Sequence, residues 1–173
     1  MFYDLLKSRR SIRKFENREV EKDKIDTILK SAALSPSARG RRPWEFIAVT
    51  DKDTLQKLSQ CREGGSQFLA GAPLGIVVAA NSEDGDIWIE DASIAAVIMQ
   101  LAAHSLGLGS CWIQVRGRMH PDGREAGDYV KEVLGIPSKY SVECIIAIGY
   151  PAESKKPYEE SDLPQGKVHF NRF

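Results

Sequence analysis

The chain has 173 residues, of which 42% are hydrophobic and 28% charged, and its 24 basic residues balance 24 acidic ones. This length and composition predict one globular domain over residues 1–173 and exclude the fibrous and disordered classes. The formal net charge is zero, so the overall charge of the protein does not favour binding to nucleic acid or to an anionic membrane. Any anion-binding site must therefore come from a local cluster of basic residues.

The cysteines and the N-terminus indicate the cellular compartment. Cys61, Cys111 and Cys144 form no Cys-x-x-Cys pair, and the three histidines do not complete a metal-ligand spacing with them. Charged residues stand where a secretory signal needs an apolar run, and polar residues interrupt the longest apolar stretch. We therefore expect buried thiols, no bound metal, no membrane segment and a cytoplasmic location.

The first half of the chain alternates helical and strand patterns. Apolar residues between Glu21 and about Leu34 recur with helical spacing, and Pro36 ends that helix because proline disfavours α geometry in the preceding residue. The β-branched and aromatic content that follows predicts a strand. The elements expected here are a short helix around Leu5 and Leu6, a helix at 21–34, a strand at 44–50 and a helix at about 54–61 preceded by a capping Asp51.

The second half contains one long segment that is apolar nearly all round. That segment, Ile87 to Leu106, should be buried on most sides as a central helix or a subunit-interface helix. The other elements expected are strands at 74–80, 110–115 and 142–149, a helix at about 126–134, and an irregular polar tail from Pro151. Interleaved helices and about four or five strands indicate an α+β layered domain.

The first candidate binding cluster is the segment from Ser8 to Arg13. Arginine offers a planar fork of donors that matches phosphate oxygens, serine adds a hydroxyl, and the cluster could reach one anionic ligand from a single turn. Spacing alone favours the alternative of a solvated basic helix end.

The second cluster runs from Pro36 to Trp44, where small residues allow close backbone approach to a ligand. Its alternatives are a surface loop and, with weak support on a neutral domain, RNA binding. The third cluster, Gly107 to Gln114, could be a packed turn or a wall against a planar ligand. It follows a helix and opens a strand, which is the reverse of the dinucleotide-binding order.

No conventional catalytic group stands out. Nothing in the sequence places a base beside Cys111, and His104 within the apolar segment is a candidate core or interface histidine.

Taken together and in order, four segments resemble the flavin-dependent nitroreductase family. They are Ser8-Arg9-Arg10-Ser11-Ile12-Arg13-Lys14-Phe15, the loop from Ser35-Pro36-Ser37-Ala38 to Pro43-Trp44-Glu45-Phe46, the block from Asp91 to Ile113, and Ile136-Pro137 with Ile148-Gly149-Tyr150-Pro151. The resemblance implies a nitroreductase-like α+β fold with a mostly antiparallel sheet. It also implies a homodimer with FMN at the subunit interface, where the long apolar helix would lie.

The resemblance also implies roles for individual residues. Arg9, Arg10 and Ser11 would hold the FMN phosphate and ribityl chain, and Arg13 would lie near flavin N1 and O2. The remaining candidates are Pro36, Ser37 and Ala38 from the other subunit, Trp112, Ile113 and Gln114 as a wall with a backbone N–H near N5, Lys155 and Lys156 at the phosphate, and Gln67 at the pyrimidine edge.

The sequence departs from the family at Gly40 and Arg42, where members commonly carry Asn and Gln. We hypothesise that Arg39, Arg41 and Arg42 instead contact flavin phosphate, nicotinamide phosphate or an anionic substrate.

The activity implied by the resemblance is a ping-pong oxidoreductase reaction. NADH or NADPH would pass hydride to flavin N5, and a small acceptor such as a nitroaromatic or quinone would then occupy the same pocket. The alternatives are an FMN storage or sensor protein without turnover and a reductive dehalogenase-like activity on the same fold.

Overall fold

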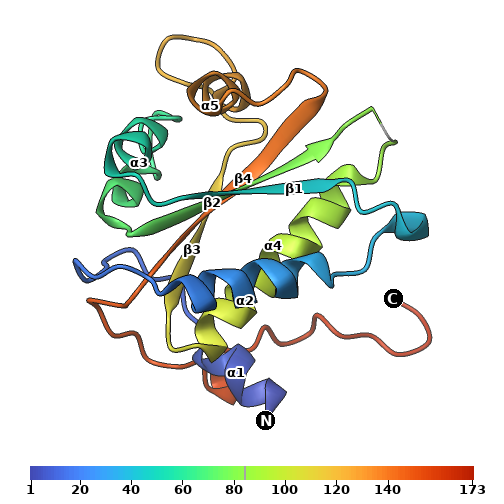
Figure 1. Ribbon diagram of the computed structural model, residues 1–173. Coiled ribbons are helices and arrows are strands. Elements are labelled where there is room, and N and C mark those ends of the chain that lie inside the picture. The colour runs from blue at the N-terminus through green and yellow to red at the C-terminus, as the bar shows by residue number, and fades with distance from the viewer. Residues whose placement is uncertain (84) are drawn as a thin grey trace.

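An antiparallel sheet crosses the middle of the molecule and has helices on both faces (Figure 1). The computed structural model describes residues 1–83 and 85–173. Over these residues the sheet has four strands in the order β1-β2-β4-β3, and all three strand pairs are antiparallel. The strands are β1 (Trp44–Val49), β2 (Leu74–Asn81), β3 (Gly109–Gln114) and β4 (Tyr140–Gly149).

The helices form two layers (Figure 1), and each layer closes a hydrophobic core against the sheet. One core lies beneath α2 and α4, and the other beneath α3 and α5. The helices are α1 (Phe2–Ser8), α2 (Lys22–Ala33), α3 (Lys52–Leu58), α4 (Trp88–Ser105) and α5 (Ala126–Leu134), with short 3-10 turns η1 (Ala38–Gly40), η2 (Gln67–Gly71) and η3 (Glu160–Asp162). The expected α+β layered fold is thus confirmed.

The longest strand-like apolar run of the sequence forms most of the central strand β2. Residues Leu74 to Ala80 of β2 are fully covered, because β1 and β4 flank the strand and helices cover both faces of the sheet. Four strands form rather than five, and the tail beyond β4 is irregular except for η3, as expected.

Most predicted boundaries differ from the observed ones by one to three residues. Asp51 is the N-cap of α3, as predicted, because its carboxylate accepts the Thr54 N–H at 2.8 Å, and the helix begins at Lys52 rather than at about Thr54. The segment expected as a plain loop after α2 contains the turn η1. The 3-10 geometry of η1 depends on hydrogen bonds that hydrophobic periodicity does not register.

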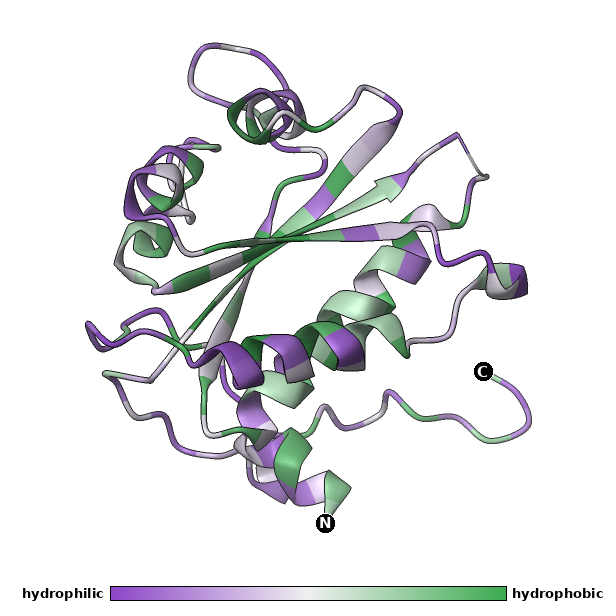
Figure 2. Cartoon of the chain, in the orientation of Figure 1, coloured by the Kyte–Doolittle hydropathy of each residue, from purple (hydrophilic) through white to green (hydrophobic). Residues whose placement is uncertain are grey.

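Helix α4 presents apolar side chains outward as well as inward. The small residues Ala92 and Ala96 pack into the core against the sheet, while Ile94 and Val97 are 40% and 49% exposed. Figure 2 shows the helix as hydrophobic along most of its length. No helix within the described residues has the length and apolarity needed to cross a membrane.

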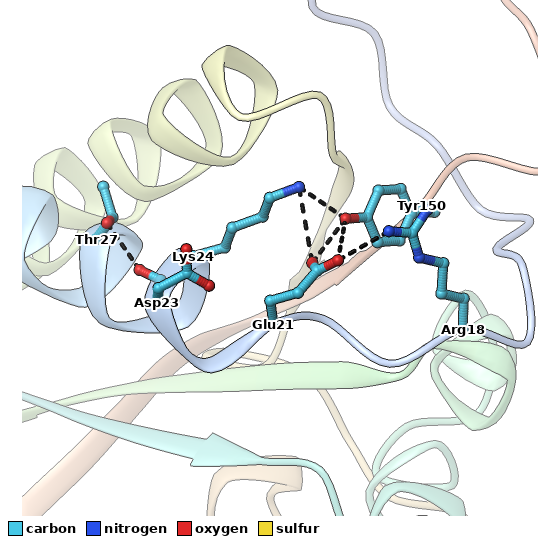
Figure 3. A network of polar contacts seen from close by, with 6 residues as sticks. All are labelled: Arg18, Glu21, Asp23, Lys24, Thr27 and Tyr150. Carbon is cyan, nitrogen blue, oxygen red and sulfur yellow. Dashed lines mark hydrogen bonds and ion pairs between the residues drawn. The ribbon is translucent and has the colours of Figure 1, made fainter.

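Two irregular segments, which we call the N-terminal strap (residues 9–16) and the tail segment (residues 150–156), follow α1 and β4 respectively. Beyond the strap, a polar network at the start of α2 joins the chain to the tail segment (Figure 3). The Tyr150 hydroxyl donates to the Glu21 carboxylate at 2.6 Å and accepts from Lys24 Nζ at 2.7 Å. Arg18 Nη2 donates to Glu21 at 2.8 Å, and its guanidinium carbon lies 3.7 Å from the centre of the Tyr150 ring.

This network predicts an acid-sensitive contact. The hydrogen bond from Tyr150, followed by backbone and Arg18 contacts, lowers the pKa of Glu21 from 4.5 to about 2. Since the pKa is lower in the folded protein, the network stabilises the fold above about pH 4.5 and loses this contribution as the pH falls towards 2. We expect Tyr150→Phe to raise the pKa of Glu21 towards its ordinary value, as measured by NMR titration of the side-chain carboxyl.

The matched control is Tyr140→Phe, which removes a hydroxyl from a long contact of 3.4 Å with Glu45. This variant should leave the Glu21 titration unchanged. A Glu21 pKa that is the same in wild type and Tyr150→Phe would contradict the assigned cause.

Candidate functional site

The strap and the tail segment lie side by side and run antiparallel, although about 140 residues separate them in the sequence. The Ala152 N–H donates to the Lys14 carbonyl at 2.9 Å, and the Glu16 N–H donates to the Tyr150 carbonyl at 2.9 Å. This pairing brings the arginine cluster of the first motif beside the tail lysines.

The strap is also fixed to the open edge of β3. The Ile12 N–H donates to the Ser110 carbonyl at 3.0 Å, and Ile12 is buried against Gly109. A Cβ at Gly109 would lie 2.8 Å from the Ile12 Cβ, which real contacts essentially never reach. Glycine at this position therefore lets the strap lie directly on the strand.

Lys155 reaches across to the strap and meets a carboxylate there. Its Nζ donates to the Ser11 carbonyl at 2.6 Å and lies 3.8 Å from Glu153. Glu153 in turn accepts the Arg13 N–H at 2.5 Å and the Lys14 N–H at 3.2 Å, and the first of these bonds chiefly lowers the pKa of Glu153. Sequence reasoning missed Glu153, since no motif marks an acid that binds backbone amides of a distant segment.

The second tail lysine has a different environment. Lys156 Nζ pairs with Glu159 at 2.6 Å and is 80% exposed. Arg10 donates to the Lys156 carbonyl, and its guanidinium carbon lies 4.2 Å from the centre of the Tyr158 ring. The side chain of Lys155 is thus directed to the strap, and that of Lys156 to its own turn.

A cavity of about 600 Å³ adjoins the strap and the tail segment. Arg10, Lys155 and His104 are among its lining residues. His104 Nε2 lies 2.8 Å from Ser8 Oγ, and burial followed by the Arg9 charge lowers the pKa of His104. The histidine is partly buried in the cavity wall, and its lowered pKa favours the neutral ring at neutral pH.

At the end of β3, one backbone edge is not paired with any strand in the part of the chain that the structure describes. Val115 donates its N–H to the Glu143 carbonyl of β4 at 3.3 Å. Because backbone groups alternate sides along a strand, the amide of Gln114 points away from β4, and the Gln114 carbonyl accepts from Arg62 Nη1 at 3.1 Å. The segment expected to form a wall beside a planar ligand, Trp112 to Gln114, thus ends in an open strand edge. Sequence reasoning did not predict the hydrogen bond from Arg62 to this edge.

The side chains of the expected wall divide between the two faces of the sheet. Ile113 is 1% exposed within the core beneath α3 and α5, so only its backbone can face a ligand. On the opposite face, Trp112 Nε1 donates to Gln114 Oε1 at 2.9 Å, and Gln114 Nε2 donates to the Arg116 carbonyl at 2.9 Å. Both polar atoms of the Gln114 side chain are therefore engaged within the chain.

The start of η2 lies close to the strap. The Arg13 guanidinium carbon is 5.8 Å from the centre of the Phe68 ring. The neighbouring Gln67 uses its Oε1 to accept the N–H groups of Gly65 and Ser66 at 2.9 and 3.2 Å. The side-chain amide nitrogen of Gln67 is therefore the group that could donate a hydrogen bond to a ligand.

The second cluster lies apart from all of these residues, after the far end of α2 (Figure 1). The Ala38 N–H donates to Asp91 Oδ1 of α4 at 2.9 Å, and Ser37 Oγ accepts the Arg42 N–H at 3.0 Å. A single chain thus brings together the strap, Lys155 and the edge of β3, but it leaves the segment from Pro36 to Arg42 elsewhere. Asp91, which anchors this segment, was not among the predicted site residues.

The cysteines offer no activated nucleophile. Cys61, Cys111 and Cys144 are all buried free thiols, and burial raises the pKa of each. Within residues 1–83 and 85–173, no group of three or more His, Cys, Asp and Glu side chains could hold a metal ion.

Comparison with known proteins gives a consistent assignment. The model of the nitroreductase family matches residues 6–150. A solved structure from Clostridium difficile, described as an FMN-dependent nitroreductase, has 62% sequence identity and a TM-score of 0.97, with 99% of each chain covered. A protein of Archaeoglobus fulgidus, named provisionally as an NADH dehydrogenase/NAD(P)H nitroreductase, is 38% identical over 162 residues, which cover 91% of this chain and 90% of that protein.

An iodotyrosine deiodinase from Thermotoga neapolitana is 25% identical over 197 residues, covering 100% of this chain and 99% of the relative. The family match spans most of the chain, and it includes the strap, the edge of β3 and the first residue of the tail segment. This chain belongs to the nitroreductase family, as the four sequence segments predicted.

Proposed function

We propose that this protein is an FMN-dependent oxidoreductase that oxidises NADH or NADPH and reduces a small acceptor such as a nitroaromatic or a quinone. The observation that carries the proposal is the convergence of the strap, Lys155 and the open edge of β3. The FMN-dependent nitroreductase from Clostridium difficile, at 62% identity, supports the choice of cofactor.

The donor set fits the chemistry of FMN. Its phosphate needs cations and hydroxyl donors, which Arg9, Arg10, Ser11 and Lys155 supply from two paired segments. Its planar ring system needs a flat backbone edge with an amide donor, and the edge of β3 at Gln114 offers one. The donor set therefore matches the chemistry of FMN.

When bound, FMN supplies the redox centre that takes up and gives back a hydride. The chain supplies binding and electrostatics. Arg13 would contribute a cation where negative charge develops on the ring, and the Gln114 N–H would be available to donate a hydrogen bond to it. If the nicotinamide and the acceptor use the same pocket in turn, the kinetics would be ping-pong.

The site also needs a second copy of the chain. The segment containing Pro36, Ser37, Ala38, Gly40 and Arg42 lies away from the strap within one chain, and we propose that it completes the site of a partner subunit. The outward face of α4, with Ile94 and Val97 exposed, supplies an apolar surface for a symmetric homodimer.

A matched pair of substitutions tests the dimer. Val97 and Met119 are both 49% exposed, so aspartate at either position leaves the core of one chain intact. We expect Val97→Asp to sediment as a monomer that has lost FMN, because a buried charge disrupts the interface. Met119→Asp should remain a dimer with FMN bound, and a Val97→Asp monomer that retained FMN would contradict the two-subunit site.

The phosphate assignment predicts a difference between the tail lysines. Lys155→Gln should weaken FMN binding about tenfold to a hundredfold, since a charge-assisted hydrogen bond is worth roughly 1.5–3 kcal/mol. Lys156→Gln should have a smaller effect, because Lys156 is paired with Glu159 and exposed. Flavin fluorescence titrations measure both affinities. Riboflavin, which lacks the phosphate, should bind wild type and Lys155→Gln equally, and an equal loss for both flavins would exclude the phosphate role.

The reaction itself is tested by an anaerobic visible spectrum of the FMN-loaded protein during addition of NADH and then NADPH. We expect the absorbance of bound oxidised flavin to bleach with at least one donor, and a nitroaromatic or quinone to restore it. Bound flavin that neither donor bleaches would favour the storage or sensor alternative. Failure to bind FMN would mean that Gly40 and Arg42 mark a site that has lost the cofactor.

A further inference from the structure

His104 lies in the last turn of α4, and the proposed reaction gives its side chain no role. The residue is partly buried and lines the cavity of about 600 Å³ beside the strap and the tail segment. Gly107, Leu108 and Gly109, which follow it in the chain, also line the cavity and bring no charged side chain. His104 is therefore a titratable group that a ligand in this cavity can approach.

The contact of His104 with α1 indicates which ring nitrogen can take up a proton. Ser8 Oγ lies 2.8 Å from His104 Nε2, and it also lies 2.8 Å from the Asp4 carbonyl and 3.2 Å from the Leu5 carbonyl. Because a carbonyl can only accept, the Ser8 hydroxyl donates its single hydrogen to the helix backbone, and its oxygen accepts the Nε2–H of the histidine. In the neutral ring, Nδ1 therefore carries the lone pair that a proton can occupy.

Basic side chains oppose protonation of this ring in the absence of a ligand. Arg10 and Lys155 line the same cavity, and Arg9 precedes Arg10 in the strap. Burial, followed by the positive charge of Arg9, lowers the pKa of His104 from its ordinary value of 6.5. The ring is thus neutral at neutral pH, although the C-terminal end of a helix favours a cation.

The acids of the neighbouring segments have other partners. Glu153, the acid in the cavity lining, accepts two backbone N–H groups of the strap and lies 3.8 Å from Lys155 Nζ. On α1, Asp4 Oδ1 lies 3.7 Å from Lys7 Nζ. Across residues 1–83 and 85–173, no carboxylate pairs with His104. An anion that enters the cavity would therefore be the first counter-ion of the ring.

We propose that His104 belongs to the phosphate site and takes up one proton from solvent, on Nδ1, when a phosphate monoester binds in this cavity. The protonated ring adds a cation and an N–H donor to those of Arg10 and Lys155. No bond of the ligand breaks. The identity of the ligand as FMN rests on the proposed function.

Binding and protonation affect each other equally, because the coupling between two sites is reciprocal. A bound anion that raises the pKa of His104 must itself bind more tightly to the protonated protein. The gain in affinity therefore appears as the pH falls through the pKa of the complex, and it is complete below the pKa of the ligand-free protein. Riboflavin, which has no phosphate, should show no such gain.

The first test is an NMR titration of the histidine side chains in wild type, without ligand and with saturating inorganic phosphate, FMN or riboflavin. We expect inorganic phosphate and FMN to raise the pKa of His104, and riboflavin not to raise it. His120 is the internal reference, since it stacks on Tyr129 of α5, on the other face of the sheet, and lies 2.8 Å from Asp122. A pKa of His104 that neither inorganic phosphate nor FMN raises would overturn the proposal.

The second test compares the FMN affinities of wild type and His104→Gln. Glutamine can offer an N–H to Ser8 but cannot take up a proton. We expect His104→Gln to bind FMN about tenfold more weakly than wild type at about pH 5.5 and equally well at about pH 8. The comparison cancels the second ionisation of the phosphate itself, near pH 6, because both proteins bind the same ligand.

The matched control is His120→Gln, which should bind FMN as wild type does at both pH values. Riboflavin should bind wild type and His104→Gln with the same ratio of affinities at both. Equal FMN affinities of wild type and His104→Gln at about pH 5.5 would contradict the proton uptake. If His104→Gln does not fold, the titration of wild type decides the question.

The same titrations separate this inference from the proposed function. If bound FMN raises the pKa of His104 but neither NADH nor NADPH reduces it, the proposed reaction fails and the proton uptake stands. If FMN does not bind but inorganic phosphate raises this pKa, the cofactor assignment fails and the phosphate site stands. If FMN binds and is reduced while His104 titrates as it does without ligand, the reaction stands and the proton uptake is wrong.

Discussion

The backbone pairing between the N-terminal strap and the tail segment is the interaction on which the rest of the candidate site depends. It fixes Arg9 to Arg13 beside Lys155, and its contact with Ser110 places both segments at the edge of β3. Backbone hydrogen bonds set this arrangement, so it tolerates variation in the exposed side chains. Lys155 and Arg10 each donate to a backbone carbonyl of the opposite segment, and Arg13 is exposed to solvent.

The position of β3 at the edge of the sheet has a second consequence. In the order β1-β2-β4-β3, only one side of β3 is paired, and the strap covers the other side at Ser110 but leaves it open near Gln114. An uncovered strand edge is a liability in most proteins because it invites pairing with other chains. Here it offers amide donors beside a cationic segment, which suits a planar anionic cofactor.

Within one chain the candidate binding motifs lie in two places, and the proposed homodimer accounts for that separation. The strap and the segment after α2 are held by different anchors, the edge of β3 and Asp91 respectively. A two-fold axis along the exposed face of α4 would allow the second segment of one chain to meet the strap of the other. The proposed homodimer would account for both the apolar outward face of α4 and the split motifs.

Local sequence patterns, namely helical periodicity, continuous apolar runs and β-branched content, were enough to predict nine helices and strands, the α+β class and the apolar surface of α4. The arginine cluster and the tail lysines were also visible as residue types. Only the tertiary structure decided that Lys155 rather than Lys156 turns towards the strap, and that Glu153, Arg62 and Asp91 hold the site segments in place. Each of these contacts joins residues more than fifty positions apart, and a local pattern carries no information about which distant backbone group a side chain will meet.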